Sequence, residues 1–222
     1  MVVKLWATRV TRGSAHGVTS RVLSDDEWQR NARLRRLEDR ELFVTAWTLA
    51  RTALAVELDV RPHALVVDRV CRLCGDPRHG KPWLPAAPHV DFNLSHTAGL
   101  VVVAVSTVGS VGVDVELADQ DLSRLRHLIL HPAEEAADDE LLRYWVRKEA
   151  VLKASGVGLS GSMLDLDLAR PPDEIQVLDL LLGPGAAGFV GALALRSHRA
   201  VALEWWLAPW HSAGSPGGEP PW

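Results

Sequence analysis

Apolar and polar residues follow two spacings along the chain, which predict helices in some regions and strands in others. Helical spacing over residues 24–51, behind capping residues Ser24 to Asp26, predicts one or two helices with a break near Glu38 and Asp39. Residues 121–130 and 133–154 are also predicted to be helical, with Pro132 at a helix start. Strands are predicted at residues 66–70, 90–94, 100–106, 111–117, 177–182, 188–195 and 200–206, the last three as a meander. The mixture predicts an α+β fold.

The length and a short internal repeat predict two related lobes. A chain of 222 residues can form one large domain or two domains of roughly 110 residues each, and the repeat favours two. Ser95-His96 precedes one buried apolar run, and Ser197-His198 precedes another in the second half of the chain. We expect an N-terminal α+β lobe at residues 1–107 and a C-terminal α+β lobe at residues 108–210. Residues 211–222 are rich in Gly and Pro and are expected to be disordered.

The composition is that of a globular protein in a reducing compartment. Apolar residues make up 47% of the chain and charged residues 23%, and the apolar runs are far shorter than the ~20 residues of a membrane span. The first residues lack the apolar core of a secretory signal, and two cysteines make no disulfide framework. We therefore expect a cytoplasmic protein that does not bind membranes.

Charge is unevenly distributed along the chain. The net charge is −4, but residues 30–40 hold five arginines, among them Arg30, Arg33 and Arg36. A basic patch in an acidic protein suits a phosphorylated small molecule better than a nucleic acid, although a solvated helix face would look the same. Arginines also far outnumber lysines, of which there are four: Lys4, Lys81, Lys148 and Lys153. The remaining lysines are candidates for positions that need a compact ammonium.

The segment VGVDVEL, residues 111–117, is the strongest chemical signal. Strand alternation puts Gly112, Asp114 and Glu116 on one face, with the glycine leaving room for a group to approach the backbone. Two neighbouring carboxylates repel each other unless a cation lies between them, and Mg²⁺ prefers such oxygen ligands. The alternative is a solvated sheet face.

Two further motifs carry polar residues. In YWVRKEAVLKASGVGL, residues 144–159, Glu149 interrupts an apolar helical stripe and Lys153 follows one turn later. A surface ion pair is the alternative interpretation. In GKPWLP and DFNLSH, Lys81 lies in a proline-stiffened loop and Ser95-His96 at a strand end, which gives a donor-rich edge suited to a phosphate.

In this order and spacing, the motifs GKPWLP, FNLSH, GVDVE and WVRKEAVLKASGVGL resemble the Sfp-type 4′-phosphopantetheinyl transferases over residues 30–160. The resemblance implies a monomer in which two similar lobes form an intramolecular pseudo-dimer, with the active site at their interface. It also implies transfer of the phosphopantetheine arm of coenzyme A to a serine of an acyl or peptidyl carrier protein, which releases 3′,5′-ADP.

The same resemblance implies roles for individual residues. Asp114, Glu116 and Glu149 match the acids that bind Mg²⁺, for which Mn²⁺ can substitute, and Glu149 and Lys153 match the catalytic pair. The matches to coenzyme A contacts are Arg30, Arg33, Arg36, Lys81, Asn93, Ser95, His96, Asp114 and Lys153. Residues 121–130, with leucines beside Arg124 and Arg126, are expected to form a helix that docks an acidic carrier protein, unless the leucines are core.

Two other functions stay open at the level of the sequence. Clustered acids with a lysine also suit a metal-dependent phosphodiesterase or nuclease. Cys71 and Cys74 have zinc-knuckle spacing, with His79 as a third ligand and His89 or His63 as a fourth, which would suit a non-enzymatic binding module.

Overall fold

The computed structural model describes residues 1–10, 22–71, 74–76, 80–156, 161–172, 174–182 and 186–207. The predicted disordered tail and His79 lie outside these residues. The helices and strands follow one another along the chain as β1 (Val2–Arg9), α1 (Asp25–Ala32), α2 (Leu37–Leu58), β2 (Asp91–Thr97), β3 (Leu100–Ser106), β4 (Val111–Leu117), α3 (Arg126–Ile129), α4 (Leu141–Ser155), β5 (Ile175–Asp179), β6 (Phe189–Arg196) and β7 (Ala202–Leu207). The expected α+β fold is confirmed.

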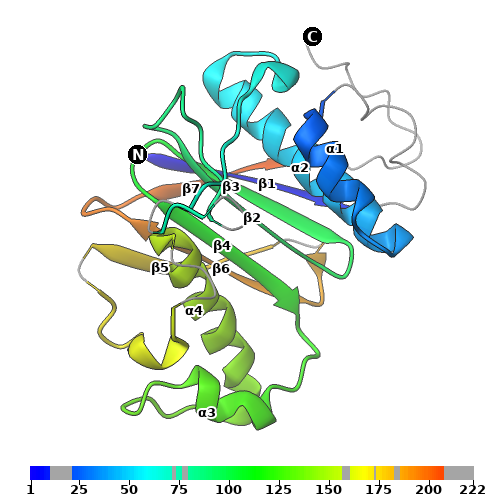
Figure 1. Ribbon diagram of the computed structural model, residues 1–222. Coiled ribbons are helices and arrows are strands. Elements are labelled where there is room, and N and C mark those ends of the chain that lie inside the picture. The colour runs from blue at the N-terminus through cyan, green and yellow to red at the C-terminus, as the bar shows by residue number, and fades with distance from the viewer. Residues whose placement is uncertain are drawn as a thin grey trace.

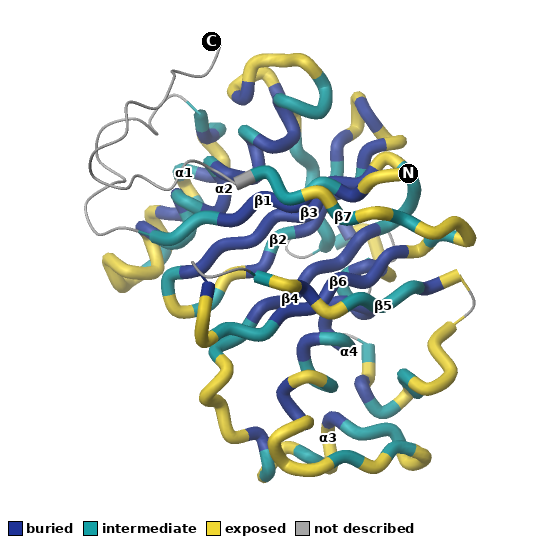
Figure 2. Tube along the Cα trace, turned by 180° about the vertical axis from the view of Figure 1, so that it is seen from behind, coloured by how far each residue is buried: buried dark blue, intermediate teal, exposed yellow. Residues whose placement is uncertain are grey.

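Two sheets pack face to face between helices, as Figure 1 shows. The first sheet has the strand order β2-β3-β1-β7 and the second has the order β4-β6-β5. Valines and leucines of β1, β3, β4 and β6 fill the space between the sheets. Helix α2 covers the outer face of the first sheet, and α4 covers the outer face of the second. Both sheets are therefore buried on two sides, and Figure 2 shows their strands mostly as buried residues.

The two sheets are joined by side chains where their edge strands β2 and β4 meet. The backbone N–H groups of Val111, Val113 and Val115 donate to the side chains of Asp91, Asn93 and Ser95, over 2.7, 3.0 and 3.3 Å. Every second side chain of β2 thus accepts a hydrogen bond from every second backbone N–H of β4, and each bonded pair has the same separation in sequence. Because a buried N–H without a partner costs about 1–3 kcal/mol, this seam fixes the register of one sheet against the other.

Several helices and strands are shorter than the pattern predicted, because local side-chain hydrogen bonds compete with regular structure. Residues 66–70 form only a single bridge, between Asp68 and Trp83, and the Asp68 carboxylate accepts the N–H groups of Arg69 and Val70. Helix α4 begins at Leu141 rather than near residue 133, and residues 121–130 contain a 3₁₀ turn and the four-residue α3.

The break between the first two helices lies at residues 33–36, a few residues before the position expected near Glu38 and Asp39. Glu38 and Asp39 occupy the first turn of α2, where acidic side chains favour the helix dipole. Ser24 caps α1 as expected, in a capping box with Glu27.

The predicted meander of the last three strands is wrong. β5 pairs with β6, but β7 leaves the second sheet and pairs in parallel with β1 of the first. Hydrogen bonds therefore join a strand of the predicted C-terminal lobe to the N-terminal strand. The proposed division at residue 107 stays a prediction.

In the described part of the chain, the helices lack the combination of length and apolarity that a membrane crossing requires.

Candidate active site

Six of the residues singled out in the sequence line one open pocket of about 260 Å³. The pocket lies where β2, β4 and α4 meet. Its walls are formed by Leu94, Ser95, His96, Asp114, Glu116, Trp145, Glu149 and Lys153. Residues from motifs separated by some twenty to forty positions in the sequence therefore come together as expected.

Asp114 is the most enclosed acid of this pocket, with 4% of its surface exposed. Its Oδ1 accepts hydrogen bonds from Lys153 Nζ at 2.6 Å and Ser95 Oγ at 2.9 Å. Its Oδ2 is buried and has no hydrogen-bond partner among the described residues. Burial raises the pKa of Asp114 above its ordinary value, although Lys153 and Ser95 act in the opposite direction.

Gly112 has a different role from the one expected. A Cβ at this position would lie 2.0 Å from the carbonyl oxygen of Ala150 and 2.4 Å from the backbone nitrogen of Ala154, both on α4. The group that approaches the β4 backbone is therefore helix α4 and not a ligand. This close contact brings Glu149 and Lys153, which are on the same helix, next to Asp114.

Glu149 projects into the pocket from the buried side of α4. It is 7% exposed, and burial raises the pKa of its carboxyl; Asp114 and Glu116 add to the rise while Lys153 opposes it. A carboxylate with a raised pKa holds a proton more readily, which suits a general base.

Lys153 connects three elements at the pocket floor. Its ammonium donates to Asp114 Oδ1 at 2.6 Å, to Ser95 Oγ at 3.2 Å and to the Val113 carbonyl at 3.2 Å. The side chain is 25% exposed, so it can still meet a ligand that enters the pocket.

Thr97 holds the third acid of the pocket and was not singled out in the sequence. Its hydroxyl donates to Glu116 Oε2 at 2.8 Å, and Gln120 donates to the same oxygen at 2.7 Å. Residues 91, 93, 95 and 97 are polar and alternate along β2, so strand alternation was the signal that could have identified Thr97.

The remaining candidates for coenzyme A contacts lie outside this pocket. Lys81 lines a second pocket of about 230 Å³ with Trp83 and Asp91, and its ammonium donates to Asp91 and to the Val111 carbonyl at 2.7 Å. Asn93 is buried in the seam, where its Oδ1 accepts from Val113.

The N-terminal arginines are at the first helix and the loop after it. Arg33 and Arg36 are exposed and Arg30 is half-buried. None of the three is among the residues that line either pocket. Their expected contact with coenzyme A stays a prediction.

The donor set of the pocket fits a hard divalent cation. Within the described ranges, no three His, Cys, Asp or Glu side chains converge closely enough, as they now lie, to hold a metal ion. The orphaned Oδ2 of Asp114 nevertheless lacks a partner, and Glu116 and Glu149 line the same pocket. Three carboxylates are ligands of the kind that Mg²⁺ takes.

Cys71 is buried and Cys74 exposed, both without a disulfide, and the zinc prediction depends on His79, outside the described residues.

The raised pKa of Glu149 predicts that Glu149→Gln stabilises the protein without divalent cations. A carboxyl whose pKa is higher in the folded state contributes stability below its unfolded pKa and loses it as pH rises through the folded value. The variant should therefore melt at a higher temperature than wild type at pH 7–8 in chelator, and the gap should close below about pH 4.5. Each kcal/mol corresponds to about 2–4 °C in Tm. Asp119→Asn, at an exposed position, is the control. An equal or lower Tm for Glu149→Gln at pH 8 would contradict this reasoning.

Comparisons with known proteins point to one family. A family profile described as the 4′-phosphopantetheinyl transferase superfamily matches residues 110–200, which include Asp114, Glu149 and Lys153. The chain is 32% identical to the 4′-phosphopantetheinyl transferase HetI of Nostoc, over 68% of this chain and 67% of HetI. It is 25% identical to a 4′-phosphopantetheinyl transferase of Bacillus subtilis, over 71% and 72% of the two chains. A Synechocystis protein provisionally named as such a transferase is 29% identical, and the match spans 60% of its length.

Proposed function

Because the chain belongs to the 4′-phosphopantetheinyl transferase superfamily of transferase enzymes, we propose that it moves the 4′-phosphopantetheine arm of coenzyme A to a carrier-protein serine. The products are the holo carrier and 3′,5′-ADP. The observation that carries the proposal is the convergence of Asp114, Glu149 and Lys153 on one pocket, within the segment that the family profile matches. We further propose the Sfp type, a cytoplasmic monomer in which both lobes belong to one chain.

The reaction forms a bond between the serine Oγ and the β-phosphorus of coenzyme A and breaks the bond from that phosphorus to the bridging oxygen. In the proposed mechanism, Glu149 takes the proton of the serine hydroxyl, directly or through a water. Lys153 stabilises negative charge on the phosphate oxygens as the leaving group departs. Mg²⁺ held by Asp114, Glu116 and Glu149 would supply Lewis-acid stabilisation of the same charge.

Coenzyme A would lie across the two pockets. Ser95 and His96 border the first pocket, and Lys81 borders the second, which residues 154–156 also line. Lys81 is held by Asp91 and Val111 at the seam, so its position is fixed before a phosphate arrives. Such preorganisation would orient the reactive phosphorus toward Glu149 and Lys153.

A mass measurement tests the proposed function. The protein is incubated with coenzyme A, Mg²⁺ and an apo carrier protein, and the carrier is examined by intact mass spectrometry. The expected result is the mass increment of one phosphopantetheine, which disappears when Mg²⁺ is chelated. A phosphodiesterase or nuclease would leave the carrier unmodified, as would a zinc-binding module, and an unmodified carrier would refute the proposal.

We propose residues 121–130, the docking segment, as the surface that meets the carrier. Leu125 and Leu128 are 37% and 51% exposed, and Arg124 and His127 are exposed beside them, whereas Leu122 and Ile129 are buried. Exposed leucines with basic neighbours suit an acidic helical partner. Arg126 is committed elsewhere, because it donates to the Ala136 carbonyl at 2.7 Å and to Asp138 at 2.6 Å.

Arg124→Glu should raise the KM for the carrier several-fold and leave the KM for coenzyme A within about twofold of wild type. Reversing one exposed charge weakens the attraction of an acidic partner, an effect that should shrink as salt screens it. Arg126→Glu is a poor probe, since it also removes the contact with Asp138. Steady-state kinetics at two salt concentrations provide the measurement, with Arg143→Glu on the outer face of α4 as the control. Equal changes in both KM values would exclude this surface.

A further inference from the structure

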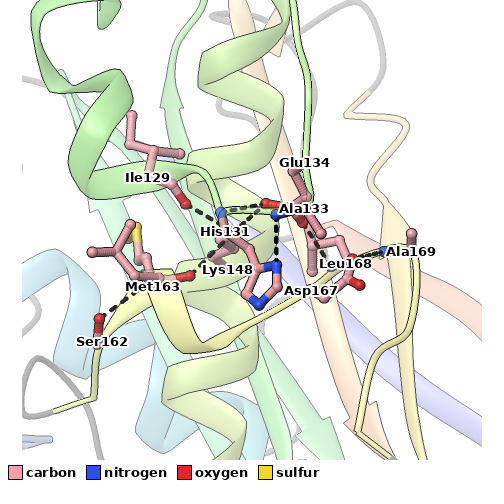
Figure 3. Close-up of polar contacts among 11 residues, drawn as sticks. Ile129, His131, Ala133, Glu134, Lys148, Ser162, Met163, Asp167, Leu168 and Ala169 are labelled. Carbon is pink, nitrogen blue, oxygen red and sulfur yellow. Dashed lines mark hydrogen bonds and ion pairs between the residues drawn. The ribbon is translucent and has the colours of Figure 1, made fainter.

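Lys148 has no role in the proposed chemistry, yet its side chain is completely buried. An ammonium has three hydrogens, and here each has an acceptor: the Ile129 carbonyl at 2.8 Å, the Met163 carbonyl at 3.1 Å and Glu134 Oε2 at 2.5 Å. Figure 3 shows Lys148 at the centre of these contacts. The planar fork of an arginine could not reproduce three converging bonds, which accounts for a lysine in a chain that otherwise prefers arginine.

Glu134 extends the contacts of Lys148 to a further segment. Its side chain is 3% exposed, its Oε2 also accepts from the His131 N–H at 2.8 Å, and its Oε1 accepts from the Leu168 N–H at 2.7 Å. Both Glu134 oxygens are thus bonded, and Figure 3 shows the same arrangement. Burial lowers the pKa of Lys148, and the bond to Glu134 opposes that change. The pair ties helix α4 to the end of α3, to residues 131–134 and to residues 163–168.

The pair connects the candidate active site to the docking segment. Lys148 and Glu149 are neighbours on α4, but Glu149 lines the pocket while Lys148 meets the last residue of α3. A four-residue helix such as α3 has no stability of its own in water. It is held by burial of Ile129 and by the bond from Lys148 to the Ile129 carbonyl. A cation at the carboxyl end of a helix is also favourable.

We propose that Lys148 is a positioning residue, which with Glu134 holds the docking segment at a fixed place relative to Glu149. This inference rests on the proposed function. The carrier serine must arrive beside Glu149 while the carrier rests on Leu125 and Leu128. A rigid link from adjacent residues of one helix sets the geometry between the two. Without the link the docking segment can move, which weakens binding of the carrier and leaves binding of coenzyme A unchanged.

The test uses Lys148→Met/Glu134→Gln, which removes the buried cation and leaves no uncompensated buried charge. Arg147→Met is the matched control, because it removes a cation from the preceding residue of the same helix, where Arg147 pairs with Asp179 near the surface. We expect the carrier KM to rise about tenfold, with the coenzyme A KM within about twofold of wild type. Amide hydrogen exchange should accelerate in residues 122–137 and stay unchanged in β4.

Other outcomes would overturn the inference. Unchanged KM values, or a fall in kcat with an unchanged carrier KM, would show that the pair serves α4 and Glu149 alone. If the double variant does not fold, Glu134→Gln is measured in the same way. If wild type modifies no carrier, the proposed function fails, and hydrogen exchange alone then decides. Acceleration in residues 122–137 and near Met163 and Leu168, with β4 unchanged, supports the anchor, and unchanged exchange in residues 122–137 refutes it.

Discussion

Glu149→Gln should lower the rate of phosphopantetheine transfer by about 10²–10⁴, the usual contribution of a general base. The amide has nearly the same shape as the carboxylate but accepts no proton and is a poorer ligand for a cation. Within the described residues, the Glu149 side chain makes no hydrogen bond, so the change breaks no polar side-chain contact that holds α4 in place. The loss should therefore appear in kcat, with the fold intact by circular dichroism.

This prediction pairs with the expected rise in the melting temperature of the same variant. Most point mutations destabilise a protein, but here activity should fall while stability without metal ions increases. Asp114→Asn should also lose transfer, although it disturbs the bonds to Lys153 and Ser95 and is the less clean probe. Full activity of Glu149→Gln at saturating Mg²⁺ would place the base elsewhere.

Lys153→Arg should lower kcat/KM by about 10²–10³, as expected for a lost electrostatic stabiliser. The ammonium converges on Asp114, Ser95 and the Val113 carbonyl, and a guanidinium is too large and too flat to meet the three acceptors from this position.

Lys4→Arg is the matched control for this substitution. Lys4 is 28% exposed, pairs with Glu57 at 2.8 Å and lies over the ring of Trp206, all of which a guanidinium can also do. It should keep wild-type kinetics and a wild-type melting temperature. Transfer by Lys153→Arg at the wild-type rate, measured with the same carrier, would contradict the role of Lys153.

The sequence predicted well what depends on neighbouring residues. Strands at 100–106 and 111–117 appear at the expected bounds, because their apolar runs identify them without distant partners. The convergence of Asp114, Glu149 and Lys153 was also expected, from the order of the motifs and the family they resemble. At the level of the superfamily this interpretation is confirmed, whereas the Sfp type and the individual site roles stay predictions.

Features that depend on distant segments were missed. The strand β1 was not predicted. It is covered by α2 on one face and by the second sheet on the other, and it pairs with residues near 100 and near 200, so its place in the sheet depends on distant segments. The β2 residues after Leu94 were expected to lie at a strand end, but Ser95 and Thr97 are bonded to β4 residues some twenty positions away. The start of α4 was misplaced because Glu134 was expected to be helical and instead bonds Lys148.

The parallel pairing of β1 with β7 constrains the order in which the molecule can be made. A ribosome delivers residues 2–9 long before residues 202–207, so one edge of β1 lacks its partner while the residues between them are synthesised. An open strand edge is a template for pairing with other chains. Until residues 202–207 are made, this edge of β1 is therefore open to pairing with other chains. Premature termination anywhere before residue 202 would leave that edge permanently exposed.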